Sequence, residues 1–155
     1  MSIEQIWEIE STNLENTLDV AERIGRRLRG GEVIELVSDL GGGKTAFVRG
    51  LAKGMGSKAT VRSPSFTLCN QYSAGELTLY HFDFYRLKKP GIMRDELAEV
   101  IDDPEAVVAV EWANIAAAVI PADHLTITIR ATGEASRHLI FNYPVQLQYL
   151  FSDNA

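Results

Sequence analysis

A glycine-rich segment between an apolar run and a helical run constrains the fold of this chain more than any other feature. Val33 to Val37 is mostly apolar and rich in β-branched residues, which predicts a short strand. The glycine-rich segment follows directly as Ser38-Asp39-Leu40-Gly41-Gly42-Gly43-Lys44-Thr45. Beyond it, apolar side chains recur at helical spacing at Phe47, Val48, Leu51 and Met55. A strand, a glycine loop and a helix in this order predict an α/β fold with an anion-binding loop where the helix begins.

The segment matches the Walker A pattern Gly-x-x-x-x-Gly-Lys-Ser/Thr except at its first position, where Ser38 replaces glycine. Glycines let the backbone turn tightly and aim its N–H groups at phosphate oxygens. Lys44 is expected between the β- and γ-phosphates, and the Thr45 hydroxyl is expected to bind Mg²⁺. The alternative is a flexible glycine turn that happens to precede Lys-Thr, but the flanking patterns favour a P-loop. The predicted nucleotide-binding residues are Asp39, Leu40, Gly41, Gly42, Gly43, Lys44, Thr45 and Ala46.

Two acidic residues are candidates for the carboxylate that a Mg²⁺-dependent hydrolase also needs at a neighbouring strand end. Glu111 directly follows the apolar run Val107 to Val110, which is typical of a Walker B segment. Asp83 ends a longer strand pattern. Either acid could instead be a surface charge or the partner in a salt bridge. We therefore predict Lys44, Asp83 and Glu111 as catalytic residues and Thr45, Asp83 and Glu111 as metal ligands, without deciding which acid binds the metal directly.

The remaining patterns predict helices mixed with strands. The predicted strands are Gln5 to Glu10, Ala106 to Val110, and two hairpins formed by Thr67 to Tyr72 with Leu77 to Tyr85 and by Leu125 to Arg130 with His138 to Tyr143. The predicted helices are Asn13 to Arg29, introduced by a capping box of Thr12 and Glu15, then Arg94 to Ile101 and a short segment at Val145 to Leu150.

The two predicted hairpins have connections too short for a parallel crossover, so their strands must pair in antiparallel fashion. The prediction is a P-loop NTPase-like three-layer α/β sandwich around a mixed parallel and antiparallel sheet. At 155 residues, the chain 1–155 is expected to form a single domain.

Composition narrows the class of partner and compartment. Acidic residues outnumber basic ones by 21 to 15, which disfavours broad nucleic-acid binding. Two local basic groupings could still serve a partner surface or could simply be solvated charge on a helix end or loop: Arg26, Arg27 and Arg29, and Arg86, Lys88, Lys89 and Arg94. Cys69 is the only cysteine, so an internal disulfide is excluded and a reducing cytoplasm is expected. No apolar stretch approaches the ~20 residues of a membrane span, and the N-terminus does not resemble a secretory signal.

Other conspicuous side chains carry less weight. The three histidines, His81, His124 and His138, are too scattered to predict a zinc site by their spacing. Trp112 is interpreted as a core residue unless it lies in the nucleotide pocket beside Glu111. No Asn-Lys-x-Asp segment that would read guanine is present, so ATP is the expected nucleotide.

With these motifs in hand, the chain resembles the TsaE family, also called YjeE, of small bacterial ATPases required for threonylcarbamoyladenosine formation in tRNA. The resemblance covers most of the chain. It rests on an early helix and four segments in order: Asp39-Leu40-Gly41-Gly42-Gly43-Lys44-Thr45, Val61-Arg62-Ser63-Pro64-Ser65-Phe66-Thr67-Leu68, His81-Phe82-Asp83-Phe84-Tyr85-Arg86-Leu87, and Val110-Glu111-Trp112-Ala113.

The resemblance implies a Mg²⁺-dependent ATPase that acts on the TsaB and TsaD proteins, with direct tRNA contact not the dominant interaction. It also implies that Ser65 and Thr67 lie in a switch-like loop near the γ-phosphate and that Asp83 is associated with the metal. Glu111 and Trp112 are implied to lie close to the nucleotide. We expect a cytoplasmic monomer or weak oligomer.

Three positions depart from the family pattern: Ser38 where glycine is usual, Gly42 where alanine is common, and Ser65 where threonine is typical. The first two changes bear on the stiffness of the loop and its affinity for nucleotide. Ser65 keeps a hydroxyl, so a polar contact there could survive.

Two other functions remain open from the sequence. A small-molecule kinase could share the loop and size, although the acidic segment Asp95 to Glu105 is a poor candidate for an arginine-bearing lid over the phosphates. A nucleotide-gated binding module, in which hydrolysis is incidental, is the other.

Overall fold

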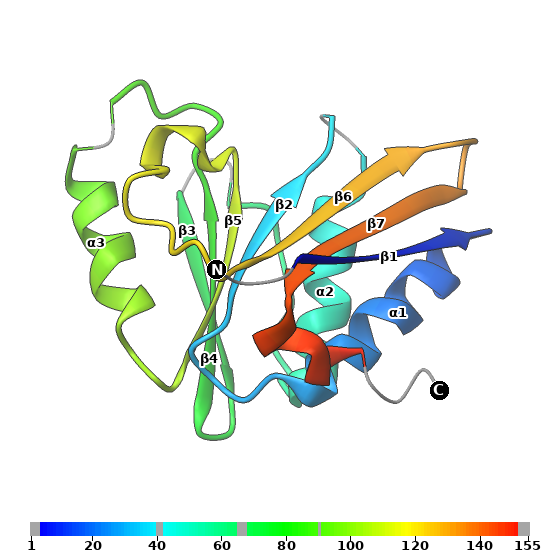
Figure 1. The fold of residues 1–155 in the computed structure, drawn as a ribbon, viewed down its shortest axis with the longest axis horizontal. Helices are drawn as coiled ribbons and strands as arrows, with labels where there is room; N and C mark the ends of the chain where they lie inside the picture. The colour runs from blue at the N-terminus through cyan, green and yellow to red at the C-terminus, as the bar shows by residue number, and fades with distance from the viewer. Residues whose placement is uncertain (1–3, 40–41, 65–67, 90, 152–155) are drawn as a thin grey trace.

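The computed structural model describes residues 4–39, 42–64, 68–89 and 91–151. Within these residues the strands are β1 (Glu4–Ser11), β2 (Val33–Val37), β3 (Cys69–Ala74), β4 (Leu77–Asp83), β5 (Ala106–Glu111), β6 (Leu125–Ala131) and β7 (Arg137–Pro144). The helices are α1 (Leu14–Arg27), α2 (Lys44–Met55) and α3 (Gly91–Ile101), with short 3₁₀ helices η1 (Ala113–Ala116) and η2 (Val145–Leu150). The described strands form one sheet in the order β1-β7-β6-β2-β5-β4-β3 (Figure 1).

The centre of the sheet is parallel and its margins are antiparallel. β2 pairs in parallel with β5 on one side and β6 on the other, and β4 lies parallel to β5. The hairpin of β3 with β4 and the ribbon of β6, β7 and β1 complete the two edges with antiparallel pairs. The α/β class and mixed sheet are thereby confirmed. Because β2, β4 and β5 run the same way, their carboxyl ends meet at the upper edge of the sheet in Figure 1.

Helices α1 and α2 cover one face of the sheet, and glycines let the two helices approach closely. Side chains of β2 such as Ile34 and Leu36 point into this layer and are buried with Phe47 of α2. A Cβ atom on Gly54 would lie 2.1 Å from the Glu22 carbonyl oxygen of α1. No side chain fits at that distance, so glycine is required for this helix spacing. The tight packing fixes the position of α2 and of the loop from which it starts.

The other face is covered over the β4–β5 half by α3 and η1 (Figure 1). Leu97 of α3 is fully buried against Phe82, Val108 and Val110. On the β1 margin of the same sheet, Ile6 retains 68% of its surface. The second helical layer of the sandwich is therefore partial.

Element boundaries shift by a few residues, and one capping prediction is wrong. The N-cap of α1 is Asn13, whose side chain accepts a hydrogen bond from the Asn16 N–H, so the capping box of Thr12 and Glu15 does not form. Asn is at least as good an N-cap as Thr, and the adjacent asparagine takes that position. The helix ends at Arg27 rather than Arg29, and α3 begins three residues before the predicted Arg94.

The β3–β4 turn also differs in detail from the predicted four-residue connection. Ala74 pairs with Leu77 across a two-residue turn at Gly75 and Glu76, in which Gly75 has a φ of 67°. The strand thus continues through Ser73 and Ala74. None of the described helices is long and apolar enough to cross a membrane.

Candidate nucleotide site at the carboxyl edge of the sheet

The loop after β2 leads into α2 through a left-handed glycine. Gly43 is the N-cap residue of α2 with a φ of 109°, a conformation that favours glycine. It supplies no side-chain cap. The backbone N–H groups in the first turn of α2 are therefore not capped by an N-cap side chain, which is the arrangement that favours a bound anion. Leu40 and Gly41, two of the predicted binding residues, lie outside the described residues.

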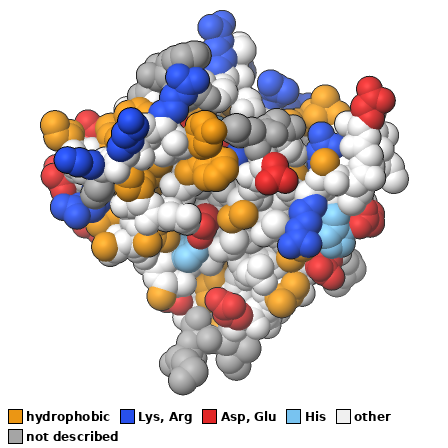
Figure 2. Space-filling model, turned by 90° about the horizontal axis from the view of Figure 1, so that it is seen from above, with side chains coloured by type: hydrophobic (Ala, Val, Ile, Leu, Met, Phe, Trp, Pro, Cys, Tyr) orange, Lys and Arg blue, Asp and Glu red, His pale blue; other side chains and the backbone are white. Residues whose placement is uncertain are grey.

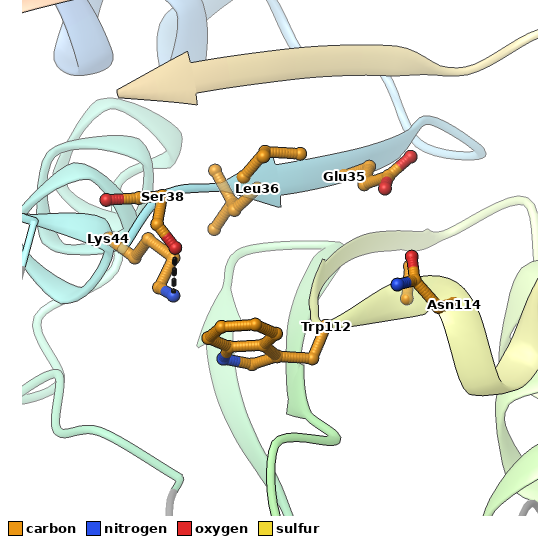
Figure 3. Close-up of a pocket in the computed structure, with 8 residues that line it drawn as sticks. Glu35, Leu36, Ser38, Lys44, Trp112 and Asn114 are labelled. Carbon is orange, nitrogen blue, oxygen red and sulfur yellow. Dashed lines mark hydrogen bonds between the residues drawn. The ribbon is translucent and has the colours of Figure 1, made fainter. Parts of the chain in front are cut away.

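Lys44, the first residue of α2, is buried with only 6% of its surface exposed. Its Nζ donates to the Ser38 carbonyl oxygen at 3.2 Å and lies 3.5 Å from Glu111 Oε1. The ammonium also lies 4.6 Å from the centroid of the Trp112 ring (Figure 3). A buried ammonium needs such compensation, and these contacts hold its charge at the head of the helix.

The two predicted carboxylates are brought together by the register of the strands. Asp83 at the end of β4 pairs directly with Glu111 at the end of β5, and both are more than 90% buried. Burial raises the pKa of Asp83, and the charge of Glu111 raises it further, whereas the Tyr85 N–H and the Lys44 ammonium act in the opposite direction. Two buried carboxylates against one ammonium leave an excess of negative charge that a cation would relieve.

Oxygen ligands for Mg²⁺ are available at this edge. Thr45 is the second residue of α2, next to Lys44, and Asp83 and Glu111 supply carboxylates. Within the described residues no group of three or more His, Cys, Asp or Glu side chains could hold a metal by themselves. A hydroxyl beside two carboxylates is a donor set that fits Mg²⁺, which takes one or two carboxylates and completes its shell with water and phosphate.

A histidine that the sequence reasoning gave no role completes the cluster. His81 of β4 is fully buried, and its Nε2 lies 2.5 Å from Glu111 Oε2. It stands two residues before Asp83, so both side chains point to the same face of the strand. That spacing was a signal available in the sequence, although the pairing with Glu111 needed the strand order.

Trp112 borders the site from the side opposite α2. Its backbone is left-handed, with φ 57° and ψ 50°, which turns the chain away from β5 into η1. Tyr85 packs on the ring with the two centroids 4.9 Å apart. A cavity of about 120 Å³ opens between Trp112 and the end of β2 (Figure 3). Its lining comprises Glu35, Leu36, Val37, Ser38, Lys44, Trp112, Ala113 and Asn114.

Arg137, which the sequence reasoning did not single out, joins the P-loop to the β6–β7 hairpin. Its Nε donates to the Gly42 carbonyl oxygen at 2.9 Å, and its Nη1 donates to the Ser136 and Gly133 carbonyl oxygens at 2.7 and 3.2 Å. A second cavity, of about 280 Å³, lies beside this link. It is lined by Leu14, Thr17, Gly43, Ala46, Glu134, Ala135 and Arg137. No local motif marks Arg137, because its partner is 95 residues away.

Ser38 and Gly42 lie against each other in the loop. A Cβ atom on Gly42 would lie 1.7 Å from Ser38 Oγ and 2.9 Å from the Asp39 carbonyl oxygen. The Ser38 hydroxyl thus fills the space that an alanine side chain at position 42 would need. Ser38 at the first position of the Walker A segment and Gly42 at its fifth are sterically matched.

The structure brings Lys44, Asp83, Glu111 and Trp112 into one cluster. Thr45 and Ala46 follow in the first turn of α2, and Asp39 is exposed on the loop. Ser65 lies outside the described residues, as does Thr67. Figure 2 looks down on this edge and shows basic side chains gathered over the α3 side. That side carries the exposed residues Arg86, Lys88, Lys89 and Arg94.

The chain is similar over most of its length to several known proteins of one family. The family model described as threonylcarbamoyl adenosine biosynthesis protein TsaE matches residues 11–139. A tRNA threonylcarbamoyladenosine biosynthesis protein TsaE from Nostoc is 39% identical over 117 residues, covering 74% of this chain and 72% of that protein. The Bacillus subtilis protein of the same name is 36% identical and covers 84% and 82%. The crystal structure of Bacillus subtilis YdiB superposes with a TM-score of 0.79 at 29% identity, covering 99% of this chain and 96% of that one.

Proposed function

The chain belongs to the TsaE family of threonylcarbamoyl adenosine biosynthesis proteins, and from this premise we propose that it binds ATP with Mg²⁺ at the P-loop and hydrolyses it. The family is involved in forming threonylcarbamoyladenosine in tRNA. Hydrolysis in the isolated protein is slow, and the nucleotide state governs its role in that modification.

One observation carries the proposal. The buried Lys44 ammonium stands at the start of α2, directly after a left-handed glycine, and faces Glu111 at 3.5 Å. The helix terminus and the ammonium favour a phosphate, whereas the Asp83 and Glu111 carboxylates favour a cation. A triphosphate with Mg²⁺ satisfies both halves of the site at once, which neither an anion nor a metal alone would do.

The described cavities support a direction for the nucleotide. Phosphates at the head of α2 would direct the nucleoside toward the cavity of about 280 Å³, because Gly43 and Ala46 belong to the predicted phosphate-binding segment and also line that cavity. Leu14, which is half exposed at its rim, offers an apolar surface for a base. Arg137 braces the opposite wall through Gly42.

Each side chain at the carboxyl edge has a separate task. The γ-phosphate replaces Glu111 as the main partner of Lys44, which frees one carboxylate oxygen of Glu111 to orient the attacking water. Thr45 and Asp83 would hold Mg²⁺, which when bound would neutralise charge on the phosphate oxygens. Trp112 covers the ammonium from the side of η1 and keeps bulk water from it.

The partners proposed for this cycle are the TsaB and TsaD proteins, with docking controlled by whether ATP or ADP is bound. The basic surface of Arg86, Lys88, Lys89 and Arg94 begins directly after Tyr85, whose ring packs on Trp112 at the nucleotide site. A pull-down of TsaB and TsaD with the protein loaded with ATP or ADP tests this proposal. Equal retention in both states contradicts nucleotide-controlled docking.

A single-turnover assay with protein in excess over labelled ATP tests the activity itself. Lys44→Ala is expected to abolish ATP binding and release of inorganic phosphate. Lys53→Ala is the matched control, because Lys53 lies on the same helix but is largely exposed. Unchanged ATP affinity in Lys44→Ala contradicts the proposed site. Consumption of ATP without release of inorganic phosphate, in the presence of a metabolite acceptor, indicates a kinase instead.

A further inference from the structure

His81 lies beneath the Glu111 carboxylate and contacts it through Nε2. The register pairs His81 with Ala109 and Asp83 with Glu111, so the imidazole lies one step below the two carboxylates on the α2 side of the sheet. The ring has no exposed surface, and Nε2 approaches Glu111 Oε2 to 2.5 Å. The other carboxylate oxygen, Oε1, faces Lys44. The two oxygens of Glu111 therefore have different partners.

The surroundings of the second ring nitrogen of His81, Nδ1, decide which of the two nitrogens carries the proton. His81 Nδ1 is buried and has no hydrogen-bond partner in the described part of the chain. A proton on Nδ1 alone would bury an unpaired donor and would turn the Nε2 lone pair toward a carboxylate. A proton on Nε2 instead donates to Glu111 and leaves only an unpaired acceptor. The surroundings thus assign the proton to Nε2.

We propose that His81 is a positioning residue that donates from Nε2 to Glu111 Oε2 and so aims Oε1 at the P-loop and the attacking water. This inference rests on the proposed ATPase function. Without the donor, the Glu111 carboxylate is free to rotate, so Oε1 no longer has a fixed direction and the base that orients the water is misplaced. Supporting groups of this kind typically change activity by about tenfold to a hundredfold when removed.

A pair of substitutions separates positioning from simple core filling. In His81→Gln the side-chain amide nitrogen reaches the place of Nε2 and can still donate to Glu111. In His81→Asn the amide takes the place of Nδ1 and cannot reach the carboxylate. His81→Asn is expected to lower the single-turnover rate constant by about tenfold to a hundredfold with ATP affinity within about twofold of the unmodified protein. His81→Gln is expected to retain most of the rate constant of the unmodified protein.

The control is the same pair of changes at His138, a histidine that also contacts glutamates, Glu8 and Glu10, but on the β1–β7 margin. His138→Asn and His138→Gln are expected to leave the rate unchanged. A readout independent of activity is a long-range ¹H–¹⁵N spectrum of the nucleotide-free protein. It is expected to show the His81 proton on Nε2, and to show that signal shifted in Glu111→Gln.

The outcomes separate this inference from the proposed function. Equal rates for His81→Asn and His81→Gln, or a spectrum with Nε2 unprotonated, overturn the inference even though the unmodified protein hydrolyses ATP. Should His81→Asn fail to fold, the spectrum and the rate of His81→Gln decide alone. Absence of hydrolysis in the unmodified protein overturns both the inference and the proposed function.

Discussion

Replacing Gly42 with alanine tests whether the loop is built as a matched pair of positions. Gly43, not Gly42, is the left-handed residue that leads into α2, so the obstacle to Gly42→Ala is space. The new Cβ would lie 1.7 Å from Ser38 Oγ, 3.1 Å from Ser38 Cβ and 2.9 Å from the Asp39 carbonyl oxygen. Relief requires the hydroxyl to rotate away, which breaks its 3.0 Å hydrogen bond to that carbonyl oxygen.

The magnitude follows from these contacts. Losing one exposed hydrogen bond costs about 0.5–1 kcal/mol, and the remaining overlap with backbone is of the overpacking kind that costs about 1–3 kcal/mol. We expect Gly42→Ala to weaken ATP binding or stability by about 2 kcal/mol in total. Ser38→Gly removes both serine atoms, so Gly42→Ala in that background should cost only about 1 kcal/mol or less.

The assay is a double-mutant cycle measured by ATP titration and by urea unfolding of all four proteins. The expected coupling between the two positions is about 1 kcal/mol or more, with the double variant better than the sum of the single changes. Additive effects, within about 0.3–0.5 kcal/mol, would refute the claim that Ser38 and Gly42 share one space.

Three further predictions concern the site and its support. Burial raises the pKa of Asp83, so its ionisation opposes folding, and stability falls as pH rises from the unfolded pKa through the folded one. Asp83→Asn should therefore raise the urea midpoint of unfolding of the nucleotide-free protein at pH 7 while weakening Mg²⁺-dependent hydrolysis. A lower midpoint contradicts the assigned charge balance. Gly54→Ala should destabilise the protein by about 2–4 kcal/mol in urea unfolding, because its Cβ would lie 2.1 Å from the Glu22 carbonyl oxygen; a change below about 0.5 kcal/mol would show that α1 and α2 can separate freely. In a Trp7→Phe background, ATP should change the fluorescence of Trp112, the remaining tryptophan, by drawing the P-loop lysine away from its ring, and an unchanged spectrum at saturating ATP contradicts that movement.

The parts of the site predicted from sequence are those encoded locally. The P-loop is contiguous, and the apolar run before Glu111 predicted a strand that is in fact buried on both faces. Asp83 was identified by its place at the end of an alternating pattern. Each of these signals lies within a few residues of the side chain concerned, so neither the strand order nor the register was needed to find it.

The parts that could not be predicted depend on which strands are neighbours. The contact of His81 with Glu111 joins residues 30 apart and requires β4 to lie parallel to β5. Arg137 reaches the loop from a hairpin near the other end of the chain. The misplaced cap of α1 has a local cause, because Thr12 and Asn13 are adjacent residues of which either can cap a helix.

The proposed function requires that the head of α2 holds the phosphates of ATP with Mg²⁺. A crystal structure of the protein with a non-hydrolysable ATP analogue and Mg²⁺ tests it most directly. We expect phosphate oxygens within hydrogen-bonding distance of the backbone at Gly43 to Thr45 and of Lys44 Nζ, with the metal against Thr45 and Asp83. A triphosphate bound elsewhere, with Lys44 still paired to Glu111, would contradict it.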